Sequence, residues 1–150
     1  MTDCVFCKIV TWEIPSFKVY EDEKFLAILD INPNTKGMTL VLPKKHFDSD
    51  AFLMPENDYL ELMSGAKKVS EILKNGLEVN RVEMVAEGMG VNHVHIKLYP
   101  LYGVDKEFKE IWAKDKVLFD SYQGYISTQL GPQADFDYLK KLAEEIKKKA

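Results

Sequence analysis

His93-Val94-His95-Ile96-Lys97-Leu98-Tyr99 is the segment from which the rest of the chain is best approached, because polar and apolar residues alternate along it. Alternate side chains of a β-strand point to opposite faces. The two histidines and the lysine therefore share one face, and the apolar residues share the other. The segment predicts a strand with one covered face and one basic face.

Two neighbouring imidazoles on one face cannot both carry a proton at low cost, so one of them stays neutral near pH 7. A neutral imidazole can act as a nucleophile, a base or a metal ligand. The same pair is also compatible with an ordinary polar strand face. The histidine pattern alone leaves these interpretations open.

Four other short segments have the composition of strands. Residues 18–21 and 25–29 are β-prone runs separated by Asp22-Glu23-Lys24, a spacing that suits a hairpin. The apolar run 38–42 is stopped by Pro43, and the run 81–86 alternates polar with apolar residues. Together with the histidine segment, they predict five strands.

Two longer segments repeat apolar residues every three or four positions, which predicts amphipathic helices. The first runs from Pro55 to Lys74, with Asn75-Gly76 as its stop signal. The second starts at Asp135, a good N-cap, and runs to Lys149, and we expect it to pack on the body of the protein. Between them, a short helix is expected around Glu107 to Lys114.

The bulk composition fits one domain, residues 1–150, because a chain of 150 residues with 46% hydrophobic content can bury one sizeable core. Its 20 basic and 24 acidic residues give a net charge of −4, so neither nucleic acid nor an acidic membrane is expected as a partner. The N-terminus lacks the pattern of a secretory signal, and no apolar run approaches the roughly 18 residues of a membrane span. We therefore expect a cytoplasmic protein.

Cys4 and Cys7 have the spacing of thiolates in tetrahedral zinc sites, whereas a disulfide between them would close only a tiny loop. Zinc prefers four ligands, so two more must come from elsewhere, and His46 and His93 are the obvious candidates. Two free thiols, or a redox pair, remain alternatives. A redox pair usually begins a helix in a βαβ pattern, which the sequence does not indicate.

Six segments resemble, in chain order, those of the histidine-triad (HIT) superfamily. They are Cys4-Val5-Phe6-Cys7-Lys8-Ile9-Val10, Glu13-Ile14-Pro15-Ser16, Val19-Tyr20-Glu21-Asp22, Leu29-Asp30-Ile31-Asn32-Pro33, Leu42-Pro43-Lys44-Lys45-His46 and His93-Val94-His95-Ile96. The likeness covers residues 2 to 102. It implies an α+β fold, with a five-stranded antiparallel sheet and two main helices, and a homodimer whose subunits join their sheets into one.

The chain is most similar to the branch that hydrolyses nucleoside phosphoramidates, dinucleoside polyphosphates or aminoacyl adenylates. In that family the residue matching His95 attacks the α-phosphorus, and water or another acceptor then resolves the nucleotidyl-histidine. Members with the cysteine pair bind a structural zinc ion through residues that match Cys4, Cys7, His46 and His93. The expected ligand is a purine nucleotide or a nucleotide conjugate.

The resemblance also suggests a nucleotide site. Asp30 matches an acidic residue that accepts hydrogen bonds from the ribose, and Gly90 and Asn92 lie in the loop that matches the phosphate loop. Four apolar residues match the walls around the base: Phe6, Ile9, Ile28 and Ile31. An apolar slot with one polar contact suits a nucleoside. Ordinary core residues, a turn aspartate and a plain glycine turn are the alternatives.

The chain departs from the family pattern at two places. Lys97 occupies the third triad position, and the loop before the triad is contracted to Gly88-Met89-Gly90-Val91-Asn92. A lysine can neutralise phosphate charge, but it is a poor proton donor near neutral pH because its reference pKa is about 10.4. Uridylyltransferase relatives also lack a histidine there, and they transfer rather than hydrolyse. We therefore expect His95 and Lys97 to be catalytic and leave hydrolysis and transfer both open.

Two competing functions remain. Three histidines could hold a catalytic zinc ion that activates water, although this would leave the cysteines unexplained. A nucleotide-binding or scaffolding module that lost turnover through the change to Lys97 is the alternative from another class of protein. The presence of His95 argues against it.

Overall fold

The computed structural model describes residues 3–104 and 113–149. The chain divides into two compact units, Met1–Phe108 and Lys109–Ala150, which are described separately. All the residues predicted to carry chemistry belong to the first unit. A single domain over residues 1–150 stays a prediction.

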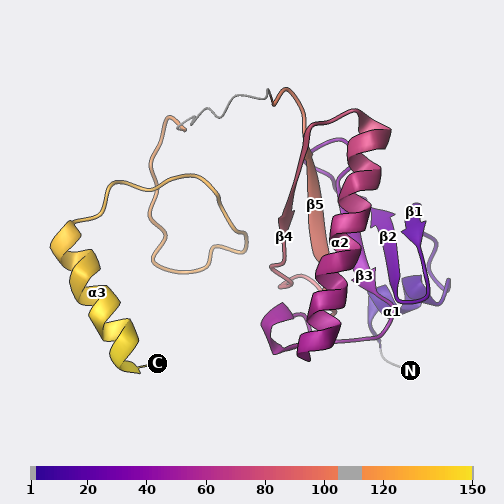
Figure 1. The fold of residues 1–150 in the computed structure, drawn as a ribbon, viewed down its shortest axis with the longest axis horizontal. Coiled ribbons are helices and arrows are strands. Elements are labelled where there is room, and N and C mark those ends of the chain that lie inside the picture. The colour runs from indigo at the N-terminus through magenta and orange to yellow at the C-terminus, as the bar shows by residue number, and fades with distance from the viewer. Residues whose placement is uncertain (1–2, 105–112, 150) are drawn as a thin grey trace. The chain divides into compact units, whose positions relative to one another are not determined.

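The first unit is built around a five-stranded sheet with the strand order β1-β2-β3-β5-β4 (Figure 1). The strands are β1 (Lys18–Glu21), β2 (Phe25–Leu29), β3 (Thr39–Pro43), β4 (Arg81–Val85) and β5 (Ile96–Leu101). Every neighbouring pair is antiparallel. The predicted α+β fold with a five-stranded antiparallel sheet is therefore confirmed.

A helix covers each face of this sheet. The long helix α2 (Glu56–Leu77) lies along one face, as Figure 1 shows, and packs on side chains such as Ala27, Val41 and Ile96. The short helix α1 (Val5–Val10) contributes Phe6 and Ile9 to a second cluster with Leu26, Ile28, Leu40 and Leu42. Successive residues of β2 and β3 thus enter opposite clusters, as strand geometry requires.

Helix α2 extends beyond its predicted end at Lys74, because Asn75-Gly76 does not stop it. The helix continues to Leu77, which packs against the main core cluster. Glu78 then takes the left-handed conformation, with φ 54°, and ends the helix. Burial of one more apolar side chain outweighs the local stop signal here.

Strand β5 begins later than predicted, because residues 93–95 lie outside the sheet ladder. Antiparallel pairing of β3 with β5 starts at Val41 and Ile96. Beyond that point Pro43 has no N–H to donate, and its carbonyl accepts a hydrogen bond from the imidazole of His93. The two histidines therefore occupy a loop that leads into the strand.

Helix α1 and the 3-10 turn Ala51–Leu53 were not predicted from the sequence. In the second unit, helix α3 (Phe136–Lys149) is confirmed, and the Asp135 carboxylate accepts from the backbone N–H of Tyr138 at 2.8 Å. Its packing on the rest of the protein stays a prediction. The expected helix around Glu107 to Lys114 lies mostly outside the described residues, and Ala113 and Lys114 are not helical. No helix among the described residues is both long and apolar enough to cross a membrane.

Candidate functional site

The triad positions lie on the face of the sheet that α1 covers. His93 and His95 are buried, with exposed fractions of 0% and 5%, and Lys97 follows in β5. The intervening Val94 and Ile96 point the other way, into the core cluster under α2. The predicted division between a polar and an apolar face is therefore confirmed, although the histidines precede the strand.

Two thiols and two imidazoles converge beside the triad. Their ligand atoms, from Cys4, Cys7, His46 and His93, all lie within 4.8 Å of one another. Cys7 Sγ lies 3.3 Å from His46 Nδ1 and 3.6 Å from His93 Nδ1, and the two Nδ1 atoms are 3.2 Å apart. Cys4 Sγ lies 3.5 Å from His93 Nδ1. The four residues expected to bind zinc thus form a cluster that could hold a metal ion.

The chemistry of this donor set fits zinc. Tetrahedral zinc with bonds of about 2.0 Å to nitrogen and 2.3 Å to sulfur places its ligand atoms about 3.3–3.8 Å apart. Most of the separations in the cluster are close to that range. His93 Nε2 donates to the Pro43 carbonyl at 2.9 Å, so Nδ1 carries the lone pair that faces the cluster.

His95 is held in one tautomer by the backbone of the first histidine. Its Nδ1 lies 2.9 Å from the carbonyl oxygen of His93, and a carbonyl can only accept, so Nδ1 carries the hydrogen. This leaves the lone pair on Nε2. The ring of Phe6 packs edge-on against His95, with the ring centroids 5.1 Å apart. A buried imidazole in this state is suited to nucleophilic attack.

Burial lowers the pKa of His95 below its ordinary value, and the positive charge of Lys97 lowers it further. The hydrogen bond to His93 and the carboxylates of Glu87 and Asp30 act in the opposite direction. Burial likewise lowers the pKa of His93. Both imidazoles are therefore biased toward the neutral form that a nucleophile or a metal ligand requires.

A cavity of about 390 Å³ opens beside His95, between α1, the loop after it and the strands β2 and β3. Most of its lining is apolar, which suits a nucleoside base. The lining includes eight of the residues predicted to be catalytic or nucleotide-binding: Phe6, Ile9, Ile28, Asp30, Ile31, Gly90, His95 and Lys97. Ile31 is 79% exposed, so it borders the opening rather than the interior.

Asp30 follows β2, and the sequence allowed it to be either a ribose contact or a turn residue. One carboxylate oxygen accepts a hydrogen bond from the backbone N–H of Asn32 at 2.8 Å, as a turn aspartate does. The residue also lines the cavity, so a carboxylate oxygen is within reach of a bound ligand. A turn role and a ribose role are therefore compatible.

The contracted loop before the triad contains one glycine that the fold requires and one that it does not. Gly88 has φ +70°, and a Cβ there would lie 2.6 Å from the carbonyl oxygen of Ser49. Gly90 lines the cavity, and a Cβ there would meet nothing within 4 Å. Asn92 is not among the cavity residues, because its amide bonds to Asp48 and to the backbone of Ser49, each at 2.9 Å. Its position does not support the predicted ligand contact.

Several residues at the site were missed by sequence reasoning. Glu87 forms an ion pair with Lys97, with 3.5 Å between Oε2 and Nζ. The cavity walls also include Val5, Ile14, Pro15, Ser16 and Phe17, from α1 and the loop after it. An acidic residue shortly before the triad was the available signal for Glu87, but only the pairing of β4 with β5 shows which residue it faces.

The HIT domain family matches residues 11–103 of this chain. Among its relatives, an uncharacterized HIT-like protein of Methanocaldococcus jannaschii is 48% identical over 109 residues, which cover 69% of this chain and 83% of that protein. The adenosine 5'-monophosphoramidase HNT1 of Saccharomyces cerevisiae is 32% identical over 147 residues, covering 95% of this chain and 80% of that one.

Among solved structures, the chain is similar to a zinc-bound histidine triad family protein from Mycobacterium smegmatis. The identity is 33%, the TM-score is 0.61, and the match covers 69% of this chain and 78% of that chain.

Proposed function

The chain belongs to the HIT domain family, and from this premise we propose that it acts at the α-phosphate of a nucleoside 5'-phosphate derivative, as a hydrolase or a nucleotidyltransferase. The observation that carries the proposal is the position of His95, buried at an apolar cavity with its Nδ1 bonded to a carbonyl. Nε2 is then the nitrogen that attacks. Asp30 and Lys97 at the same cavity supply the contacts for ribose and phosphate.

In the first step, the lone pair of His95 Nε2 attacks the α-phosphorus, and the bond from phosphorus to the leaving group breaks. The leaving group departs with the bonding electrons and takes a proton from water or from the Lys97 ammonium, which is a weak acid near neutral pH. The ammonium of Lys97 stabilises the negative charge on the phosphoryl oxygens.

In the second step, water or the hydroxyl of another acceptor attacks the same phosphorus atom. The phosphorus–nitrogen bond breaks, its electrons return to Nε2, and the acceptor loses its proton to solvent. Free His95 and a nucleoside monophosphate, or its ester with the acceptor, are the products. The choice between the two products depends on which acceptor reaches the cavity.

We also propose that Cys4, Cys7, His46 and His93 hold a structural zinc ion, which the distances and donor types of the cluster support. The similarity to the zinc-bound Mycobacterium smegmatis protein supports the same assignment. When bound, the ion would supply a link between α1, the end of β3 and the triad loop. His93 would then serve both sites, through its imidazole and its backbone carbonyl.

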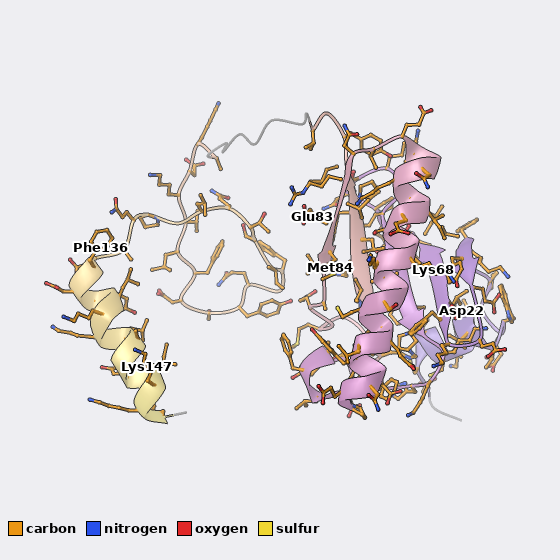
Figure 2. The ribbon with its side chains drawn as sticks, viewed as in Figure 1. Asp22, Lys68, Glu83, Met84, Phe136 and Lys147 are labelled. Carbon is orange, nitrogen blue, oxygen red and sulfur yellow. The ribbon has the colours of Figure 1, made fainter. Side chains whose placement is uncertain are left out.

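The relationship to the yeast adenosine 5'-monophosphoramidase supports a purine nucleotide conjugated to an amine as the ligand. A homodimer joined through β4 fits the fold, because β4 is an edge strand and its Met84 is 57% exposed (Figure 2). Size-exclusion chromatography with light scattering would give twice the mass of 17.3 kDa for such a dimer.

Denaturing mass spectrometry after mixing with adenosine 5'-phosphoramidate tests the covalent mechanism. The parent protein is expected to gain the mass of one adenylyl group, whereas His95→Ala gains none and still binds adenosine monophosphate. Turnover without any adduct, in single-turnover samples quenched early, would contradict the nucleotidyl-histidine. Nucleotide binding without adduct or turnover would favour the scaffolding alternative, which the replacement of the third histidine by Lys97 suggests.

A further inference from the structure

Glu87 is a charged residue beside the cavity that the mechanism above does not use, and it contacts Lys97 of the cavity lining. Its Oε2 lies 3.5 Å from Nζ of Lys97, and the two side chains are only 14% and 28% exposed. Lys97 lines the cavity, whereas Glu87 does not. The carboxylate therefore acts on a bound ligand through Lys97 and through its charge.

The pairing of β4 with β5 explains how the two residues meet. Val85, the last residue of β4, lies opposite Lys97 in the antiparallel register. Glu87 follows two positions later, where the chain leaves the sheet, so its carboxylate returns beside the lysine. Gly88, which follows directly, takes a positive φ that turns the chain toward the triad.

The ion pair between Lys97 and Glu87 is longer than a charge-assisted hydrogen bond. A charge-assisted hydrogen bond between an ammonium and a carboxylate is usually about 2.7–2.9 Å long. The separation here is 3.5 Å, and Lys97 also lines the cavity, so a phosphate oxygen bound there can compete with Glu87 for the ammonium. Glu87 thus positions the cation without removing it from the cavity.

The charges around the cavity limit how much negative charge a ligand can bring. Lys97 is the cation of the lining, Glu87 offsets it, and the Asp30 carboxylate adds a second negative charge. Because the Glu87–Lys97 pair is largely shielded from solvent, its field is less screened than that of a surface pair. One phosphate can be matched by Lys97, whereas each further phosphate adds negative charge to a site that already holds the carboxylates of Glu87 and Asp30.

From this arrangement, and resting on the function proposed above, we propose that Glu87 is a positioning residue that sets the charge selectivity of the site. It favours nucleoside conjugates with a single phosphate and an uncharged or cationic leaving group, and it disfavours polyphosphate chains. Replacement of Glu87 by a neutral residue then relaxes this selectivity.

Isothermal titration of adenosine and its mono-, di- and triphosphate, without divalent cations, tests this in the parent and in Glu87→Gln. In the parent, the di- and triphosphate should bind no more tightly than the monophosphate. In Glu87→Gln, the triphosphate should gain about tenfold in affinity, since one nearby charge in a partly shielded site has an effect of that order. The diphosphate should gain less, and adenosine should be unchanged.

Glu61→Gln is the matched control, because it makes the same change of charge in an exposed ion pair with Lys24, on the helix α2 that covers the face opposite the cavity. It should leave the order of the four affinities as in the parent. Equal ratios of triphosphate to monophosphate affinity in the parent and Glu87→Gln would overturn the inference, provided that adenosine still binds both.

A parent that binds the triphosphate more tightly than the monophosphate would also overturn the inference, so the test does not depend on the variant folding. If the parent binds none of the four ligands, the proposed nucleotide site itself fails, and this inference fails with it. The two failures are therefore distinguishable by the adenosine titration.

Discussion

The two faces of the sheet receive side chains from the same strands but have very different covers. One face is packed by α2, a helix of 22 residues, and forms a closed apolar core. The other is covered by α1, a helix of six residues, and by the loop after it, and it keeps a cavity of about 390 Å³. The long helix stabilises the fold, and the incomplete cover leaves room for a ligand beside His95.

Helix α1 cannot be held in place by its own helical stability. An isolated helix of six residues is unstable in water, and α1 has no side-chain cap at its start. Cys4, its N-cap residue, and Cys7, in its first turn, meet His46 and His93 from the sheet side. A metal ion at this cluster would fasten α1 where packing alone is weakest.

Loss of the metal site should therefore have the largest effect on stability, and it should act through the face that α1 covers. Cys7→Ser should abolish the binding of one zinc ion per chain. It should lower the free energy of unfolding by about 5 kcal/mol, because structural zinc binds small peptides with roughly 10 kcal/mol or more and only part of that is lost in a protein with a core of its own. Metal analysis and thermal unfolding would measure this. A protein purified without chelators that holds no zinc, with both thiols titratable, would contradict the assignment.

Two truncations of buried side chains, one on each face of the sheet, should differ in their effects on stability and on KM. Leu62→Ala removes a fully buried side chain from α2 and should cost about 2–5 kcal/mol of unfolding free energy, with KM unchanged. Ile9→Ala removes a wall of the cavity instead, so it should destabilise less and raise KM more. Denaturant titration would measure the loss of unfolding free energy in both variants, and steady-state kinetics would measure KM. A larger rise in KM for Leu62→Ala than for Ile9→Ala would contradict the assignment of the cavity face to ligand binding.

Two glycines of one loop provide a finer test. Gly88→Ala places a Cβ against the Ser49 carbonyl at a positive φ, so it should destabilise the protein by about 2–3 kcal/mol. Gly90→Ala has open space and should leave stability unchanged. If backbone N–H groups near Gly90 contact the phosphate, this variant should still weaken binding of adenosine monophosphate. Equal unfolding midpoints for Gly88→Ala and Gly90→Ala would contradict the inference that the backbone requires glycine only at position 88.

The smallest expected effect is at Asp30. Asp30→Ala should weaken binding of adenosine monophosphate by about 1.5–3 kcal/mol, the usual contribution of a hydrogen bond to a charged acceptor. Asp30→Asn keeps an oxygen for the turn to Asn32 and separates the turn role from the ligand role. Titrations with ribose and dideoxyribose ligands would measure both. If Asp30→Ala discriminates between these ligands as well as the parent, Asp30 is only a turn residue.

Local pattern was sufficient for much of the fold. Strands β1 and β2 occupy the predicted residues, because their alternation and the Asp22 turn are local signals; the Asp22 carboxylate accepts from the backbone N–H groups of Lys24 and Phe25. The four metal-ligand candidates named from the sequence also lie together in the structure, and their binding of zinc stays a prediction. The need for four zinc ligands made His46 and His93 candidates, and the family resemblance implied the same set of four.

Other features had no adequate local signal. Helix α1 is too short to show a period of its own, and its apolar residues are explained only by the cluster they complete. Asn92 was expected at the ligand, but its amide ties two loops together through Asp48 and Ser49. The start of β5 at Ile96 depends on Pro43 in a strand far away in the sequence.

The sequence alone thus specified which residues alternate, which carry donor atoms and which types of ligand they suit, because these properties follow from backbone geometry and side-chain chemistry. It could not specify that His93 would serve the metal cluster with its ring and His95 with its carbonyl, or that Glu87 would face Lys97. Those relations join segments distant along the chain. They depend on strand pairing and on burial, which exist only once the sheet and both of its covers have formed.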